Sequence, residues 1–471
     1  MSKYDLLLKN TRVFDPKNGI DKVVDIAMEN GKISQIKEDI NPQNAKQVLD
    51  LKGMTTIPGI IDMHVHAGSI WGSQFAQKML SRAGVCTALD MAGPLENVLE
   101  VLKGNSAGLN LAILQYASPP FTLKSNNPNK IEIEKLVDDS LGGGAYGVKL
   151  LGGHYPLTPE SSLELIDIIN KKGGYVAWHA GTTTKGSNIE GMRQAVECAG
   201  KNFLHLAHIN SYCRGNIRSD IEEVREAVEL LEAHPNIYSE SYISPLNGTQ
   251  LNSKDEEPIS LVTRNCLKSL GFSPTNDGVK EAFLNSKVFC IIEKDGESVR
   301  LTGEEGIKEW QKRDTNIGGM FPVNPVYPRI TLAGAKRKSG DFVVDCFSTD
   351  GGCIPRNVIV NMGLALVELD VISLKDFVLK TSWNPSRMLR LPNKGHLAIG
   401  MDADITVLDL DRKKPVATIV DGEVSMLNGQ IFGDKTRIIC TPKGEKALKE
   451  KGFSTYVADP SKPPLKISET R

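Results

Sequence analysis

Two histidines stand one residue apart in the stretch PGIIDMHVHAG, which spans residues 58–68. Because side chains alternate between the two faces of a β-strand, His64 and His66 would lie on the same face. Two imidazole nitrogens at this spacing could bind one metal ion. A single histidine at a strand end is usually a core or surface residue, but a pair is harder to explain in that way. The pair therefore predicts a metal site.

Further polar side chains occur in or directly after other apolar runs of the chain. They are Lys149 in GVKLL, His179 in GYVAWHAG, His205 and His208 in NFLHLAHINS, and Asp350 in FSTDGG. Taken singly, Lys149 could form a salt bridge and Asp350 could cap a helix. Nitrogen and oxygen ligands without cysteine suit Zn2+, although Fe, Mn and Ni also accept them. A common location for these residues would favour a metal site.

The elements that would position these residues are eight apolar runs separated by helical patterns. Segments such as SSLELIDIINKKGG and SDIEEVREAVELLEAHPN have apolar residues at helical spacing. Apolar strands that alternate with helices are typical of a parallel sheet, and eight of them favour a closed (β/α)8 TIM barrel in the α/β class. The carboxyl ends of all barrel strands meet at one mouth. The runs are GIIDMHVHAG, GVCTALDMAG, LNLAILQYASP, AYGVKLLGG, GYVAWHAG, NFLHLAHINS, NIYSESYIS and DFVVDCFSTDGG.

The two ends of the chain differ from its middle. Both ends show alternating apolar and polar residues with turns, which predicts one small β-sandwich domain built from residues 1–57 and 395–440. The barrel is expected over residues 58–394, with an insertion at about 245–338 beside the mouth. The charged, proline-containing residues 441–471 suggest an extended or partly disordered tail.

Composition limits the possible partners and the compartment. The chain has 471 residues, 40% hydrophobic and 24% charged, with a formal net charge of −1. Without a basic excess, nucleic acid is not expected as a partner. We find no segment apolar enough to cross a membrane and no signal-peptide pattern at the N-terminus. The eight cysteines form no CxxC pairs, so they are interpreted as reduced core thiols of a cytoplasmic protein.

The motifs in their order along the chain resemble those of the amidohydrolase superfamily, which holds urease, dihydroorotase, hydantoinase and D-aminoacylase. The resemblance rests on PGIIDMHVHAG, FSTDGG, TSWNPSRMLRL and the closing GHLAIGMDADITVLDLD, and it covers nearly the whole chain. It implies a metal-dependent hydrolase that cleaves a non-peptide C–N bond, in a cyclic amide or an N-acyl amino acid. A hydroxide bridging the metals would attack, with Asp350 as general acid and base.

The resemblance also implies a ligand set for two divalent metals, which we expect to be two Zn2+ per chain. His64 and His66 would bind the more buried metal, and Asp350 would contact it. Lys149, carboxylated on its side-chain nitrogen, would bridge the two metals. The second metal would be bound by His179 and His208.

Two choices in this set are open to question. His205 and His208 have odd spacing, so they would point to opposite faces of a strand; we choose His208 and expect His205 to face the helices. The layout around strands four and five resembles the D-aminoacylase branch, whose members usually lack the lysine. Lys149 instead resembles the hydantoinase, dihydroorotase and urease pattern. Cys86 is a conceivable bridging thiolate but is more simply a small buried residue.

Loop residues after the strands would select a small-molecule substrate. The candidates are His154, Tyr155, Lys185, Tyr212, Arg214, Tyr242, Asn247 and Arg356, and the basic ones could bind a carboxylate. Two alternatives to the amidohydrolase interpretation are a mononuclear aminohydrolase (deaminase) of a heterocycle and a non-catalytic assembly protein related to dihydropyrimidinases. The resemblance also implies a homo-oligomer, either a dimer or a tetramer.

Overall fold

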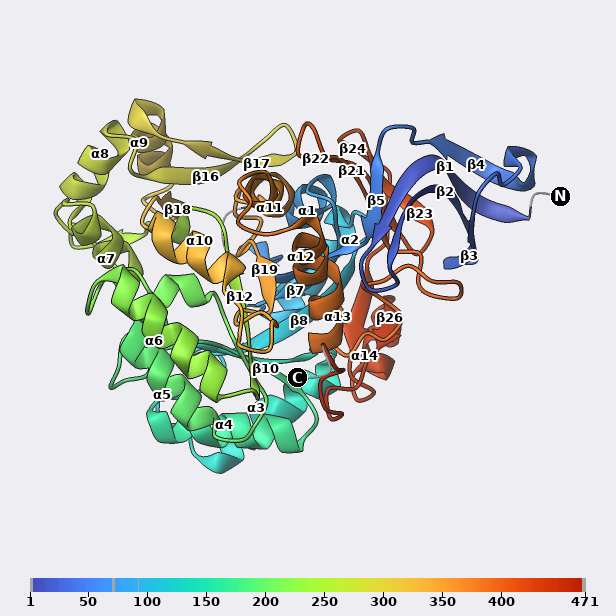
Figure 1. The fold of residues 1–471 in the computed structure, drawn as a ribbon. Coiled ribbons are helices and arrows are strands. Elements are labelled where there is room, and N and C mark those ends of the chain that lie inside the picture. The colour runs from blue at the N-terminus through green and yellow to red at the C-terminus, as the bar shows by residue number, and fades with distance from the viewer. Residues whose placement is uncertain (1–2, 70–72, 92, 468–471) are drawn as a thin grey trace.

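The computed structural model describes residues 3–69, 73–91 and 93–467, and its centre is a barrel of parallel strands (Figure 1). Each strand pairs with the next one in chain order, and every pairing is parallel. The short strand β20 (Gly351–Gly352) then pairs with the first barrel strand and brings the ends of the sheet together. This confirms the predicted barrel. Its strands are β6 (Ile60–His66), β7 (Val85–Asp90), β8 (Asn110–Ala117), β9 (Gly147–Leu151), β10 (Tyr175–His179), β11 (Leu204–Leu206), β12 (Ile237–Tyr242) and β19 (Cys346–Ser348).

Helices cover the outside of the barrel, where they bury the outward side chains of the strands. Val148, Val176 and Trp178 pack with apolar residues of the helices in one buried cluster. Helix ends follow the local sequence: Ser219 and Glu222 form a capping box at the start of α6. The covering helices are α1 (Ala76–Arg82), α2 (Leu95–Asn105), α3 (Lys130–Gly143), α4 (Pro159–Lys171), α5 (Ile189–Ala199), α6 (Asp220–Ala233), α10 (Val326–Gly334), α11 (Ile359–Glu368), α12 (Leu374–Val378) and α13 (Asn384–Met388).

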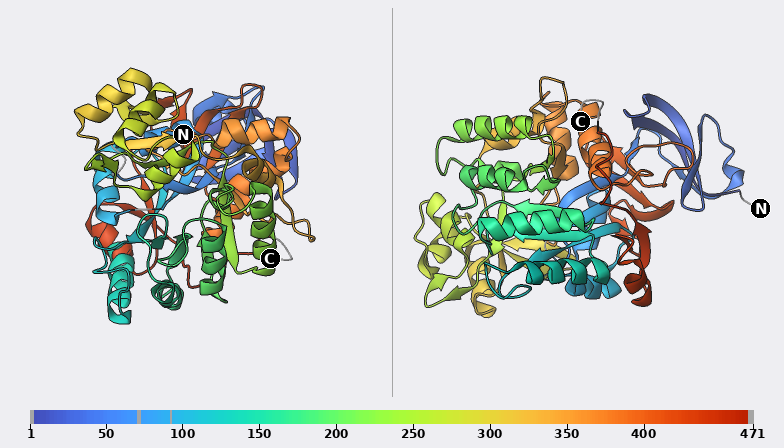
Figure 2. Two further views of the ribbon diagram at one scale, coloured as in Figure 1. Left: turned by 90° about the vertical axis from the view of Figure 1, so that its left-hand side faces the viewer. Right: turned by 90° about the horizontal axis from the view of Figure 1, so that it is seen from below.

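A separate nine-stranded sheet joins the two ends of the chain. Its two halves meet where β5 (Thr55–Pro58) pairs antiparallel with β21 (Ile405–Asp409), and they share one apolar core. This confirms a β-domain made from both chain ends, which lies at one end of the molecule (Figures 1 and 2). The other strands are β1 (Tyr4–Asp15), β2 (Ile20–Glu29), β3 (Lys32–Lys37), β4 (Ala45–Asp50), β22 (Lys414–Val420), β23 (Glu423–Leu427) and β24 (Gln430–Ile431).

The insertion after β12 forms a small α+β unit at the opposite end of the molecule (Figure 2). Its four-stranded antiparallel sheet and three helices enclose a core that includes Phe283 and Trp310. Helix α10 packs against α6 and so belongs to the barrel, although it falls within the predicted range 245–338. The elements are β13 (Asn247–Gln250), β16 (Phe289–Lys294), β17 (Glu297–Leu301), β18 (Gly318–Phe321), α7 (Leu261–Ser269), α8 (Asn276–Leu284) and α9 (Gly303–Lys312), with a hairpin of β14 (Ser253–Lys254) and β15 (Glu257–Pro258).

The C-terminal segment is folded, not the extended or partly disordered tail that its composition suggested. Strand β25 (Arg437–Cys440) pairs parallel with β8 and with β26 (Ser454–Val457), and α14 (Glu445–Glu450) lies between them. The sheet of the β-domain ends with β24, so β25 belongs to the barrel sheet, although residues 437–440 fall within the predicted β-sandwich. Residues 468–471 of the predicted tail lie outside the described residues. None of the described helices is long and apolar enough to cross a bilayer.

Candidate metal centre

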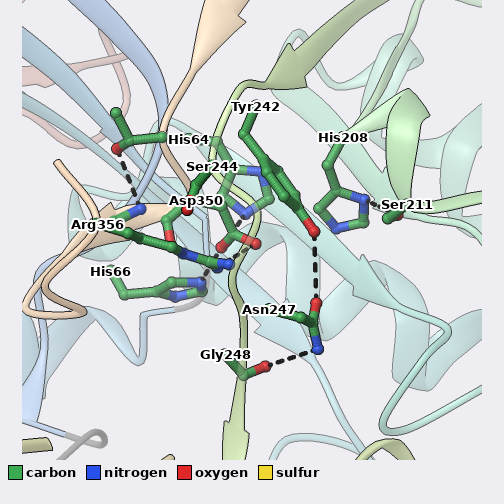
Figure 3. A network of polar contacts seen from close by, with 12 residues as sticks. His64, His66, His208, Ser211, Tyr242, Ser244, Asn247, Gly248, Asp350 and Arg356 are labelled. Carbon is green, nitrogen blue, oxygen red and sulfur yellow. Dashed lines mark hydrogen bonds and ion pairs between the residues drawn. The ribbon is translucent and has the colours of Figure 1, made fainter. Parts of the chain in front are cut away.

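Three side chains from the first and the eighth barrel strands converge at the mouth. Asp350 Oδ1 lies 2.8 Å from His66 Nε2 and 3.4 Å from His64 Nε2. The donor atoms of these three residues lie within 4.8 Å of one another, close enough to share one metal ion. Figure 3 shows both imidazoles directed at the same carboxylate.

The backbone at the end of strand eight turns Asp350 toward the histidines. Asp350 has a φ of 49°, a left-handed conformation that is rare outside glycine and often found at functional sites. Before it, Thr349 donates through both its amide and its hydroxyl to the buried carboxylate of Asp62 on β6. After it, Gly352 lies so close to β6 that a Cβ there would be 2.3 Å from the carbonyl oxygen of His66. These contacts fix strand eight against strand one.

A second pair of histidines lies beside the first group. His179 Nδ1 and His208 Nε2 are 3.0 Å apart, and the ring centroids of His64 and His208 are 5.2 Å apart. His208 lies two residues beyond β11 with a φ of 35°, which turns its side chain into the mouth. The structure therefore brings His64, His66, His179, His208 and Asp350 together.

The outward-facing ring nitrogens of His64, His179 and His208 each have a partner. His179 Nε2 lies 2.8 Å from the hydroxyl of Ser187, and His208 Nδ1 lies 2.6 Å from that of Ser211. His64 Nδ1 lies 2.7 Å from the carboxylate of Glu240 on β12. Histidines that bind metals commonly hold their other nitrogen in this way, which fixes the tautomer and the ring orientation.

The electrostatics of the two groups suit metal binding. Burial lowers the pKa of His64, His179 and His208 well below the ordinary value, so the rings are neutral, as metal ligands must be. Burial alone would raise the pKa of Asp350, but the Arg356 guanidinium and the two nearby histidines hold it well below its ordinary value. Asp350 is therefore ionised at neutral pH.

Lys149 lies inside the barrel, below the mouth, with 1% of its surface exposed. Its Nζ lies 3.2 Å from Met91 Sδ. Burial lowers the pKa of Lys149, and the carboxylates of Glu240 and Asp350 partly oppose this shift. A lowered pKa increases the fraction of the amine that is unprotonated at neutral pH, and carboxylation by CO2 requires the unprotonated amine.

His205 lies on the inner face of the barrel and not against the helices, whereas Cys86 is the small buried residue that was expected. His205 pairs in register with Ala177, which pairs with Lys149, so the three side chains share the inner face of the barrel. His205 Nδ1 contacts the hydroxyl of Tyr175 at 3.0 Å, and the prediction that His205 faces the helices is wrong. Cys86 contacts the carbonyls of Ile405 and Ile419 at the β-domain, far from the mouth end of β7.

Arg214 lies at the centre of a polar network beside the second histidine pair. Its guanidinium donates to Asn324 Oδ1 at 2.9 Å, Tyr242 Oη at 3.0 Å and Asn247 Oδ1 at 2.9 Å. The ring of His208 lies 5.9 Å from that of Tyr242. All three partners are uncharged, and no carboxylate among the described residues forms an ion pair with Arg214. The network thus presents a positive charge near the candidate metal site.

Arg356 is placed differently from Arg214. Its side chain is 1% exposed and lies 2.5 Å from Asp350 Oδ2, with further bonds to the carbonyls of Asp350 and Leu246 (Figure 3). The guanidinium also stacks over the ring of Tyr242. Its donors are therefore directed at the protein and hold Asp350 in position.

The remaining predicted substrate residues lie in three environments. Tyr212 is buried, and its hydroxyl accepts from the amide of Ala180. Lys185 is exposed and pairs with Glu190 at 2.9 Å. His154 and Tyr155 are exposed in the turn after β9, where the His154 ring lies 5.7 Å from that of His179. Of these four, Tyr212 and His154 lie beside the histidine pair, since the Tyr212 ring is 5.5 Å from that of His208.

Comparisons with known proteins agree with this geometry. The sequence model of the Amidohydrolase family matches residues 328–435. The dihydroorotase of Trichlorobacter lovleyi is 24% identical over 427 residues, which are 86% of this chain and 89% of that protein. These matches support the amidohydrolase superfamily for this chain.

Two solved structures show how far the amidohydrolase fold is shared. The N-acyl-D-glutamate deacylase of Bordetella bronchiseptica, solved with zinc and a phosphonate inhibitor, has a TM-score of 0.63 at 12% identity and covers 90% of this chain and 96% of its own. The D-hydantoinase of a Thermus species has a TM-score of 0.57 at 16% identity and covers 92% and 98%. At these identities the likeness concerns the fold alone.

Sequence reasoning missed several residues of this candidate site. Glu240 was hidden in the strand NIYSESYIS, where a polar residue on an apolar strand was the only signal. Ser187 lies eight residues beyond His179, and Asn324 lies late in the predicted insertion, so neither could be linked to the site by spacing. Ser211 had a signal, because it follows His208 in HINS.

Proposed function

We propose that this protein is a metal-dependent amidohydrolase that cleaves a C–N bond of a small cyclic amide or N-acyl amino acid carrying a carboxylate. The observation that supports it most is the adjacency of two donor groups at the barrel mouth. One holds His64, His66 and Asp350 within 4.8 Å of one another, and the other holds His179 and His208 with nitrogens 3.0 Å apart. Neutral imidazoles and an ionised carboxylate form a donor set that zinc accepts.

The described residues fit two divalent ions. His64 and His66 would hold the first with Asp350, and His179 and His208 would hold the second. Carboxylated Lys149 would supply the negative charge between two dications, a role that its burial and lowered pKa support. Such ions, when bound, acidify a water molecule and polarise the carbonyl of the substrate.

Asp350 is the residue that can move a proton in this reaction. Its Oδ2 is held by Arg356, whereas its Oδ1 faces the two histidines of the first group. Being ionised, Asp350 can accept a proton from the attacking water at Oδ1 and return it to the departing nitrogen. Arg356 would keep the carboxylate oriented through both transfers.

Arg214 would bind the carboxylate of the substrate. Three neutral oxygens orient its guanidinium, so its charge is available for an anionic ligand near His208 and Tyr242. Dihydroorotases and N-acyl-D-glutamate deacylase, with which this chain was compared, have names that denote carboxylated substrates. Asn247 and Tyr242 would form the wall of this subsite.

Turnover of a substrate panel by the zinc-loaded protein tests the proposal. The panel holds dihydroorotate, hydantoins, N-acyl-D- and N-acyl-L-amino acids and amino-substituted heterocycles. We expect hydrolysis of a carboxylated amide, lost on chelation and restored by zinc. Ammonia release from a heterocycle, with about one metal per chain and no effect of Lys149→Ala, would instead show a mononuclear deaminase. No turnover of any member by the metal-loaded protein would favour a non-catalytic assembly protein.

A further inference from the structure

Glu240 lies at the junction of four barrel strands, where the two donor groups meet. Its side chain is fully buried on β12. Oε1 accepts from His64 Nδ1 and from the backbone amide of His208, both at 2.7 Å. Its other oxygen contacts the hydroxyl of Ser348 on β19. We call His64, His66 and Asp350 the first half-site, and His179 and His208 the second half-site. The Glu240 side chain therefore contacts a ligand side chain of the first half-site and the backbone of a ligand in the second.

The contact with His64 selects one tautomer of that ring. Burial raises the pKa of Glu240 to about 8, and because Oε1 already accepts from the amide of His208, an acid proton would lie on Oε2. Oε1 therefore accepts from His64 Nδ1–H in either protonation state of Glu240, and the lone pair of Nε2 is directed at His66 and Asp350. Without an acceptor at this position, a buried N–H would be unsatisfied or the ring would take the other tautomer. The other tautomer would place a proton where a metal has to bind.

The contact with His208 stabilises an unfavourable backbone conformation. His208 has a φ of 35°, in the left-handed region that is unfavourable for a residue with a side chain. The bond from its amide to Glu240 Oε1 helps to hold this conformation, and with it the direction of the ring toward His179. The position of the second half-site thus depends on the same oxygen that orients His64.

We propose that Glu240 is a positioning residue that couples the two metal half-sites, by fixing the tautomer of His64 and the backbone of His208 through one oxygen. This inference rests on the proposed metal-dependent function, because it concerns how the chain prepares its own ligands. It assigns no contact between Glu240 and substrate.

The variants Glu240→Met and Glu240→Gln distinguish hydrogen-bond acceptance by Glu240 from the effect of having an acidic group at this position. Methionine has a similar size but cannot accept the two bonds, whereas glutamine can still accept through its Oε1 and donate to Ser348. Zinc dissociation constants, measured by competition with a chromophoric chelator, should rise 10- to 100-fold in Glu240→Met, in both binding steps. Glu240→Gln should remain within threefold of the wild type.

Glu223→Met is the matched control. Glu223 is also fully buried, but it accepts from the amides of Gly215, Ile217 and Arg218, in the loop before α6. Its replacement should lower the melting temperature without changing zinc affinity. Equal zinc affinity in Glu240→Met and the wild type, or an equal loss in the Gln and Met variants, would overturn the positioning role.

Nitrogen NMR of the metal-free wild type keeps the test decisive if Glu240→Met does not fold. The His64 ring, assigned with a His64→Asn variant, should show the Nδ1–H tautomer, and an Nε2–H tautomer would overturn the inference. A wild-type protein that binds no zinc would refute the proposed function itself. Wild-type binding together with a negative result for Glu240 would refute only the inference.

Discussion

Gly153→Ala should misplace His179 while leaving the rest of the barrel intact. Gly153 lies in the turn after β9, and a Cβ there would be 2.1 Å from His179 Nε2 and 2.7 Å from Cε1. Ordinary contact needs at least about 3.4 Å, so the ring or the turn must shift by about 1.3 Å. The ring cannot move this far and keep Nε2 within 2.8 Å of Ser187 and Nδ1 within 3.0 Å of His208.

The expected result is weaker binding at the second half-site. Displacements of about 1 Å at a functional group can cost about 100-fold in activity, and overpacking costs about 1–3 kcal/mol of stability. Two zinc dissociation constants are expected, and we assign the larger one to the second half-site. In Gly153→Ala this larger constant should rise by 10- to 100-fold in chelator competition. The smaller dissociation constant, which we assign to His64, His66 and Asp350, should change much less.

Gly142→Ala is the control for this prediction. Gly142 lies in α3 with open space where its Cβ would be, so alanine there should leave zinc binding unchanged and stabilise the helix by up to about 1 kcal/mol. If Gly153→Ala folds and binds zinc as the wild type does, His179 is not a ligand in the orientation described. The assignment of the second half-site would then be wrong.

Three further predictions follow from charges in the barrel. Arg356→Met leaves the carboxylate of Asp350 buried without its ion pair, so we expect a loss of about 3–5 kcal/mol in urea unfolding. Arg214→Met should raise KM for a carboxylated substrate about 10- to 100-fold with zinc affinity unchanged, measured by steady-state kinetics and chelator competition. His64, His205 and His208 have lowered pKa values when folded, so only the unfolded chain is protonated just below pH 6.5. Stability of the metal-free protein should therefore fall with falling pH, by about 1.4 kcal/mol per unit per histidine, and His205→Gln should reduce that slope by one histidine.

The barrel could be predicted because its pattern is regular over most of the chain. Each of the eight apolar runs contains a strand. The carboxyl ends of parallel barrel strands lie at the same mouth, independent of the length and conformation of the loops. This alone indicates that His64, His66, His179 and Asp350 lie close together. The pairing of the chain ends was equally predictable from the alternating patterns that flank the barrel.

The alternation rule failed where the strand itself was short. It predicted opposite faces for His205 and His208, but β11 ends at Leu206 and His208 lies in a left-handed turn beyond it. Both rings therefore lie inside the barrel, one below the mouth and one in it. Sequence spacing predicts the face of the sheet on which a side chain lies only where the backbone is a strand.

The C-terminal segment shows a different limit. Its charged residues and prolines are typical of a tail, yet β26 pairs with β25, and Leu448 and Ala458 are buried. The short apolar stretch RIIC was the only local signal, and it could equally have been the last strand of the β-domain. Which sheet a strand of this length joins is decided by long-range packing, which one sequence does not reveal.

Glu240 is a residue of the candidate site that could not be predicted from the sequence. On the inner face of β12 it lies between Tyr238 and Tyr242, two residues away on either side, where an apolar residue would pack well. A buried carboxylate is costly unless several donors satisfy it, and here the donors are a ligand ring, a ligand backbone amide and a serine from strands that are distant in sequence. The polar residue that breaks the apolar face of a barrel strand is therefore best understood through the groups it positions. In this chain those groups belong to both halves of the candidate metal centre.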